Sequence, residues 1–260
     1  MNSPAVPAQR IRGPEERARS INSLLDTNMY SEPGGITLWL ASQLARGNAR
    51  TVSTGYAALD KELPGGGWPV GSQTELLQQQ PGIGELRLLR PALLARSARP
   101  IALLAPPHTP QALSLVGWGI SPERLLWIDA QRTADVLWAA EQTLRAGTCG
   151  VLVLWQSHLR NDALRRLHLA AQTSDTLFFV VRPAACARDA SPSPLRLALE
   201  PAAGGVTVNF VKRRGPQQET PLLVALEPSP ILLYRHAAPV DLPTPAVAPS
   251  RSLPADLVHH

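Results

Sequence analysis

The chain has 260 residues, of which 44% are apolar, and a formal net charge of +5. This length is enough to bury one substantial core with tails in addition, and the apolar fraction is typical of a globular protein. No run approaches the ~20 consecutive apolar residues of a membrane-spanning helix. The first 20 residues carry charges where a signal peptide would be apolar, so we expect a cytoplasmic protein without a membrane partner.

Arginine carries almost all of the positive charge, because Lys61 and Lys212 are the only lysines. Its guanidinium suits bidentate contacts to carboxylates or phosphates, so an acidic protein partner and a nucleic acid remain alternatives. The two cysteines, Cys149 and Cys186, are too few and too unpatterned for a disulfide framework or a zinc site. Redox or metal chemistry is therefore not indicated. We also expect no cofactor and no small-molecule substrate.

The two ends of the chain differ in composition from its middle. Residues 1–33 are rich in Pro, Arg, Ser and Asn, and residues 228–260 contain frequent prolines. Segments of this kind lack the apolar surface that offsets chain ordering, so we expect mobile tails. One short apolar cluster in the second tail is a candidate for docking on a partner or for packing back on the domain: Ile231, Leu232, Leu233 and Tyr234.

Buried apolar runs alternate with amphipathic segments in the middle of the chain. The runs predict strands buried on both faces, and they lie at residues 73–77, 101–105, 125–128, 151–155 and 177–181. The amphipathic segments predict helices at residues 85–97, 110–118, 134–146 and 162–173. Such alternation predicts a mostly parallel, twisted sheet with helices on both faces.

The period of the pattern changes after residue 194. Apolar residues then alternate with polar or small ones over residues 195–199 and 206–210, and Gly204-Gly205 separates the two runs. This alternation is typical of an antiparallel hairpin with one wet face. We expect the hairpin at the edge of the sheet.

A degenerate phosphate loop follows the first predicted core strand. A working loop has the pattern G-x-x-x-x-G-K-[ST], in which backbone amides, the lysine and the hydroxyl serve the phosphates and Mg²⁺. With Gly84 on the last glycine, Gln79 replaces the first glycine, Glu85 the lysine and Leu86 the hydroxyl residue. Gly82 and Gly84 retain amides near a helix start, yet a carboxylate there satisfies the helix dipole and repels phosphate. We therefore predict a structural loop.

Pro91 lies within the helical segment that follows this loop. Proline removes one backbone donor and tends to kink a helix interior. We expect either a kink at this position or a helix that begins later.

The order of these features resembles the RecA family. The resemblance is carried by a T-G-x-x-x-L-D opening (Thr54, Gly55, Leu59, Asp60), a glycine-rich turn at residues 65–67, a strand into the loop and a terminal hairpin. The blocks PGGGWPVG and GIGELRLL resemble the ImuA family of RecA-like accessory proteins over about residues 33–227. The resemblance implies a RecA-like core at residues 54–227. Before it, residues 34–53 would pack on the core or a partner through Leu38 and Trp39.

Comparison with RecA-like ATPases indicates two further losses. Their metal-orienting acid ends a buried strand, which here ends in Trp155. Their catalytic glutamate follows the strand at residues 101–105, where this chain has Pro106, Pro107 and His108. Together with the altered loop, these differences predict a pseudo-ATPase that is not an enzyme.

Basic residues at two places are candidate contacts for DNA or a partner. Residues 182–194 occupy a position comparable to the second DNA-binding loop of RecA, and they contain Arg182 and Arg188 but no aromatic residue to stack a base. The hairpin ends in Lys212, Arg213 and Arg214. A solvated basic rim, a protein-binding rim and weak or indirect DNA contact remain alternatives.

The ImuA resemblance implies a non-catalytic accessory protein of SOS-induced translesion DNA synthesis. Its implied partners are ImuB, the polymerase DnaE2 (also called ImuC) and RecA itself. One alternative is a SulA-like cell division inhibitor that binds FtsZ, against which the N-terminal segment and long C-terminal tail argue. A second alternative is a RecA-like ATPase or DNA-binding protein.

Overall fold

The computed structural model describes residues 50–215 and 218–227. The predicted tails lie outside the described residues, as do nearly all of residues 34–53 and the docking candidates Leu38, Trp39, Ile231, Leu232, Leu233 and Tyr234. Among the described helices, none has the length and apolar character needed to cross a membrane.

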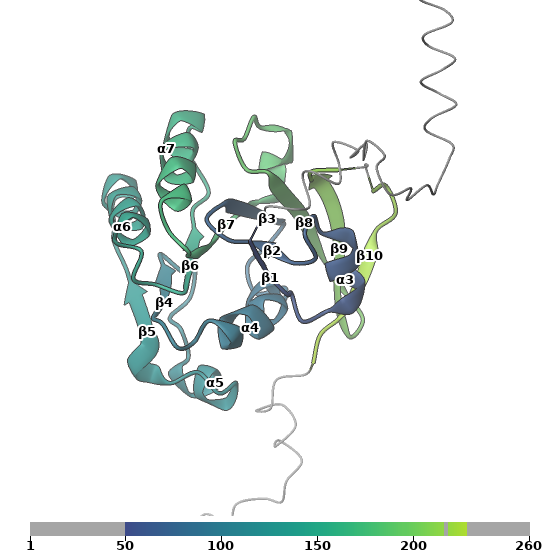
Figure 1. The fold of residues 1–260 in the computed structure, drawn as a ribbon, viewed down its shortest axis with the longest axis horizontal. Coiled ribbons are helices and arrows are strands. Elements are labelled where there is room, and N and C mark those ends of the chain that lie inside the picture. Colours follow the sequence, from purple (N-terminus) through teal and green to yellow (C-terminus); the bar gives the residue numbers. More distant parts are fainter. Residues whose placement is uncertain (1–49, 216–217, 228–260) are drawn as a thin grey trace, which may run out of the picture. The chain divides into compact units, whose positions relative to one another are not determined.

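An eight-stranded sheet forms the centre of the described region (Figure 1). Its order is β10-β9-β8-β3-β7-β6-β4-β5, with parallel pairing from β8 to β5 and antiparallel pairing among β8, β9 and β10. The predicted class, a RecA-like α/β fold, is confirmed. The strands are β3 (Gln73–Gln78), β4 (Ile101–Leu104), β5 (Leu125–Ile128), β6 (Val151–Trp155), β7 (Leu177–Pro183), β8 (Leu195–Ala202), β9 (Gly205–Lys212) and β10 (Leu222–Ala225).

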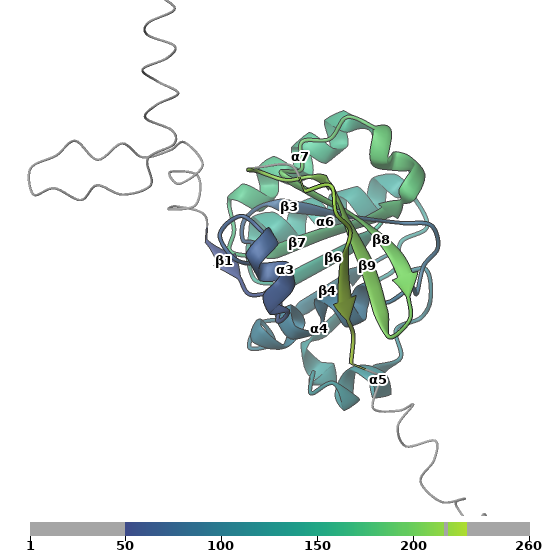
Figure 2. The same ribbon diagram turned by 90° about the vertical axis from the view of Figure 1, so that its right-hand side faces the viewer.

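Helices cover both faces of the sheet (Figures 1 and 2). One face packs against α3 (Ala57–Glu62), α4 (Glu85–Ala95) and α5 (Ala112–Gly117), and the other against α6 (Thr133–Ala146) and α7 (Asn161–Gln172). Along β4, β6 and β7, apolar residues alternate between two buried clusters, one on each face of the sheet, as period-2 side-chain geometry requires. Two short 3₁₀ helices, η1 (Pro122–Arg124) and η2 (Ala184–Arg188), and a small antiparallel pair, β1 (Thr51–Val52) with β2 (Trp68–Pro69), complete the described elements.

The two ends of the sheet differ from the sequence-based expectation. β5 was predicted to be buried on both faces, but it is the terminal strand and Trp127 is 49% exposed. That prediction was wrong because an apolar run alone does not distinguish an edge strand from a central one. The predicted hairpin of β8 and β9 is present, yet β10 pairs outside it and forms the other edge.

Asp60 explains the opening T-G-x-x-x-L-D motif. Its carboxylate accepts hydrogen bonds from the backbone N–H of Thr54 at 2.8 Å and from the hydroxyl of Ser53 at 2.6 Å. Leu59, one residue earlier, is completely buried in the core. Asp60 therefore fixes the backbone that leads into α3, and Leu59 anchors this helix on the sheet.

Pro91 lies within α4, which begins at Glu85, so the expected alternative of a helix that begins later is wrong. A proline cannot donate to the carbonyl four residues earlier, which here is the carbonyl of Arg87. The hydroxyl of Tyr56 donates to that carbonyl at 3.1 Å instead. Gly55 leaves room for the proline ring, because a Cβ there would lie 2.4 Å from the Cβ of Pro91. The conformation of α4 therefore depends on Gly55 and Tyr56, which belong to the motif that opens the core.

Candidate functional site

The loop of residues 79–84 lies where parallel α/β sheets place their ligand sites. β3 is a central strand between β7 and β8, and the loop of residues 79–84 leaves its carboxyl end. The segments that follow β4, β6 and β7 begin at the same edge of the sheet. Crevices at such edges are the usual binding sites of this architecture.

The Glu85 carboxylate folds back onto the loop that precedes it. One oxygen accepts the backbone N–H of Gly82 at 3.2 Å, and the other accepts the N–H of Gly84 at 3.3 Å. The residue is buried in the first turn of α4, where a negative charge is favoured by the helix dipole. The carboxylate thus occupies amides that a phosphate group would need.

Residues from the end of the described chain close the other side of this loop. Gly84 has a φ of 122°, and a Cβ there would approach Leu226 Cδ1 to 2.9 Å. The guanidinium of Arg87 donates to the carbonyl oxygens of Leu226 at 2.9 Å and Glu227 at 2.7 Å. Arg90 forms an ion pair with the Glu227 carboxylate at 2.6 Å. The loop is consequently packed against protein on the side of β9 and β10.

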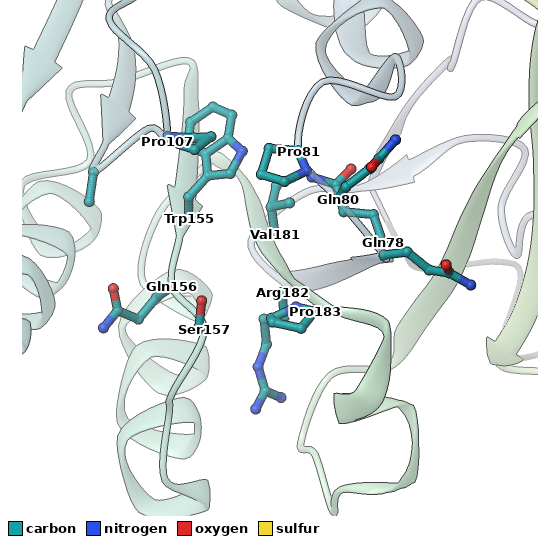
Figure 3. Close-up of a pocket in the computed structure, with 12 residues that line it drawn as sticks. Gln78, Gln80, Pro81, Pro107, Trp155, Gln156, Ser157, Val181, Arg182 and Pro183 are labelled. Atoms are coloured by element: carbon teal, nitrogen blue, oxygen red, sulfur yellow. The ribbon is translucent and has the colours of Figure 1, made fainter.

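A cavity of about 320 Å³, which we call the Trp155 pocket, lies on the opposite side of the loop (Figure 3). Trp155, Pro81, Pro107 and Val181 supply much of its wall. The two exposed residues Gln79 and Gln80 also line it, together with Gln78, Ala105, Gln156, Ser157, Arg182 and Pro183. Its lining is therefore mainly apolar, with amide groups from the loop.

Trp155 ends β6, as predicted. The residue is 7% exposed, and its indole nitrogen, Nε1, has no hydrogen-bond partner in the part of the chain that the structure describes. The same residue also lines a neighbouring cavity of about 220 Å³, to which Glu85 and Leu86 contribute as well. Within residues 50–215 and 218–227, no group of three His, Cys, Asp or Glu side chains is arranged to hold a metal ion.

A buried charged cluster around Glu75 was not anticipated from the sequence. Glu75 lies in the middle of β3, is completely buried, and accepts from Arg182 at 3.3 Å and Arg196 at 3.2 Å. Its other oxygen accepts from the hydroxyls of Ser191 and Ser193. An acid in the middle of an apolar run was the available signal, but its partners come from β7, β8 and the loop between them.

This cluster also fixes the loop between β7 and β8. Arg196 donates to the carbonyl oxygens of Cys186 at 2.7 Å and of Ala187 and Asp189 at 3.1 Å. Arg182 pairs with the Asp189 carboxylate at 3.3 Å. The segment compared above with a DNA-binding loop is therefore held to the sheet by buried charges.

The structure separates the predicted basic candidates into different environments. The prediction that Arg182 contacts DNA or a partner was wrong, because the residue is only 3% exposed and its guanidinium pairs with Glu75 and Asp189. Arg188 is exposed on η2. Lys212 donates to the carbonyl of Ser191 at 2.9 Å, and Arg213 pairs with Glu62 at 2.9 Å and stacks on Phe210. Arg214 is exposed beside them.

Lys212 and Arg214 lie within electrostatic range of α7. Burial lowers the pKa of His168 below 6.5, and the positive charges of Arg214 and Lys212 lower it further. These two cations and His168 therefore come together at the end of the sheet opposite the Trp155 pocket. The exposed members of this group remain candidate contacts.

Comparison with known proteins adds no relative: the chain matches no protein-family model and is not significantly similar to any curated protein.

Proposed function

We propose that the chain is a non-catalytic, RecA-like accessory protein of SOS-induced translesion DNA synthesis. In this role it bridges ImuB and the polymerase DnaE2 (ImuC) in the cytoplasm, with RecA as a third partner. The partners and the pathway come from the ImuA resemblance. The structure supports the non-catalytic part of the proposal through the geometry of the loop.

The observation that carries the proposal is the position of the Glu85 carboxylate. It accepts hydrogen bonds from the Gly82 and Gly84 amides, which a nucleotide phosphate would need. A phosphate placed there would meet a buried negative charge instead of the lysine of a working loop. The Glu85 carboxylate therefore takes the place that a phosphate group would have at this loop.

The surroundings of the loop support the same proposal. Trp155 replaces the acid that would orient Mg²⁺, and Pro107 lines the cavity near where the catalytic glutamate would stand. An apolar wall of this kind favours a protein or peptide ligand over a metal–phosphate complex. We therefore assign binding of a protein or peptide, rather than nucleotide hydrolysis, to this edge of the sheet.

Restoring the lysine tests the pseudo-ATPase proposal. We expect Glu85→Lys to show no Mg²⁺-dependent ATP hydrolysis above the wild-type protein, because the metal-orienting acid and the catalytic glutamate are still missing. A phosphate-release assay on the full chain measures this, with Glu123→Lys, an exposed position, as a charge-matched control. Hydrolysis that appears only in the Glu85 variant would contradict the proposal.

Affinity capture from DNA-damaged cells of the host tests the pathway. We expect ImuB-like and polymerase subunits, or RecA, to co-purify with the tagged full chain. Binding should then be reproduced with purified partners. Recovery of FtsZ without these proteins would instead support the division-inhibitor alternative.

Removal of residues 228–260 tests the contribution of the tail to partner binding. We expect the truncated chain to lose partner affinity by about tenfold or more, while its melting temperature changes by less than about 3 °C, because the described core ends at residue 227. Titration calorimetry and a thermal scan on the same preparations measure both. Equal partner affinity for the two proteins would remove the tail from the proposed mechanism.

A further inference from the structure

The Trp155 pocket contains a hydrogen-bond donor without a partner. Trp155 is more than nine-tenths buried, yet its Nε1–H meets no acceptor among residues 50–215 and 218–227. Figure 3 shows this nitrogen directed across the pocket toward Pro81. An unsatisfied buried donor is costly, so a ligand that places a carbonyl oxygen there would relieve an existing penalty.

The walls around this donor restrict the chemistry of the ligand. Pro81, Pro107 and Val181 present apolar surface and no side-chain hydrogen-bonding group. Arg182, the charged residue of the lining, is directed to Glu75 and Asp189. A complementary ligand would therefore offer apolar rings and free carbonyl oxygens to this part of the pocket.

A proline-containing peptide in the polyproline II conformation has these properties. Its backbone makes no internal hydrogen bonds, so its carbonyl oxygens are available. Proline has no N–H, so burying it leaves no unsatisfied donor. Recognition of such peptides by aromatic-lined grooves is a recurring mode.

The chain itself carries a segment of this kind close to the pocket. Residues 239–249, with the sequence PVDLPTPAVAP, contain four prolines. The described chain ends beside the loop, where Leu226 lies against Gly84 and Arg87 holds the Glu227 carbonyl. The intervening residues 228–238 can span about 36 Å when extended, at ~3.3 Å per residue. That length is ample to pass from Gly84 to Pro81.

We propose that the Trp155 pocket is a binding site for a proline-rich extended peptide, and that residues 239–249 of the same chain occupy it. The indole N–H of Trp155 donates to a backbone carbonyl of the segment, and the proline rings pack against Pro81 and Pro107. A tether of this length gives an effective concentration of about 1 mM, so a weak contact is sufficient for docking. This proposal does not depend on the translesion function.

Nuclear magnetic resonance of the full chain tests the proposal. With ¹⁵N-labelled tryptophan, the Trp155 indole signal is assigned from its absence in Trp155→Phe. A nitroxide is then attached at Ser250→Cys in a Cys186→Ser background, since Cys149 is buried. We expect the label to broaden the Trp155 indole signal. The signal of Trp138, which is 64% exposed on α6, serves as the internal reference.

Two variants of the labelled protein test the chemistry of recognition. Replacing Pro243 and Pro245 by alanine should remove the broadening at Trp155. Replacing Trp155 by phenylalanine keeps an apolar ring but removes the donor, and we expect the docking equilibrium constant to fall about five-fold. The mobile fraction of the nitroxide in electron paramagnetic resonance spectra measures this change, with Trp138→Phe as the matched control.

The outcomes are distinguishable. An unbroadened Trp155 signal, or broadening that survives the double proline substitution, would overturn the proposal. Mixing ¹⁵N-labelled chains with unlabelled chains that carry the nitroxide tests a second copy as the source of the segment. Broadening that appears only in this mixture would overturn docking within one chain.

Discussion

The two buried carboxylates near β3 are neutralised by different means. Glu75, inside the strand, accepts from the guanidinium groups of Arg182 and Arg196. Glu85, at the start of α4, accepts from two backbone amides and the favourable end of a helix dipole. The first arrangement joins distant segments by full charges, whereas the second is local and uses partial charges. We therefore expect the two sites to differ strongly in their effect on stability.

Replacing Glu75 by glutamine should have the largest effect. The substitution leaves two buried guanidinium groups without their shared counter-charge, and breaking a buried ion pair costs about 3–5 kcal/mol. Urea denaturation of the full chain should show a loss of this size in the free energy of unfolding. Glu123→Gln, at an exposed position, should change it by less than about 0.5 kcal/mol.

A triple substitution sharpens this prediction. Changing Glu75 to leucine together with Arg182 and Arg196 to methionine removes the three buried charges at once and leaves the Asp189 carboxylate, which is 54% exposed, to be hydrated. Apolar replacement of a complete buried cluster is often neutral or stabilising, so much of the lost stability should return. A triple variant that is less stable than Glu75→Gln would show that packing, rather than unpaired charge, dominates this site.

Replacing Glu85 by glutamine should have a smaller effect. The amide oxygen can still accept one loop N–H, and the loss is limited to a charge-assisted hydrogen bond and part of the dipole interaction. We expect the free energy of unfolding to fall by about 1.5 kcal/mol. The same denaturation experiment measures it. A loss equal to that of Glu75→Gln would remove the distinction between the two carboxylates.

The smallest expected effect on stability is that of His168, whose protonated form is repelled by neighbouring positive charges. Burial, followed by repulsion from Arg214 and Lys212, lowers its pKa in the folded protein below 6.5. The unfolded chain therefore binds this proton more tightly, and its contribution to stability should fall as the pH drops through 6.5 toward the folded value. His168→Gln should reduce the slope of stability against pH, measured by denaturation between about pH 7.5 and 5, near the ordinary histidine pKa.

The contrast between the two carboxylates also explains what the sequence could predict. Glu85 was assigned its place in the first turn of α4 because the signal lies within a few neighbouring residues. Glu75 was missed because its partners lie 107 and 121 residues away, and the strand order that brings them together is not encoded in any local pattern. Arg182 was misinterpreted for the same reason.

The predictions of strands and helices show the same difference: features set by neighbouring residues were predicted, and features set by distant residues were not. The central strands were predicted well because they are buried on both faces, and apolar runs report this directly. The burial of β5 and the presence of β10 depend on which strand is terminal, which only the completed sheet decides. The continuity of α4 through Pro91 depends on a hydroxyl from Tyr56, 31 residues from its acceptor.

The contact of Leu226 and Glu227 with Gly84 and Arg87 has a consequence for synthesis of the protein. Arg87 and the Glu227 carbonyl that it holds are separated by 140 residues. At roughly 5–20 residues per second, the ribosome needs about 7–28 s to make that interval. During this time the start of α4 lacks the segment that covers it, so the loop can reach its final arrangement only when the core is nearly complete. A nascent chain stalled before residue 226 should therefore expose this edge to chaperones.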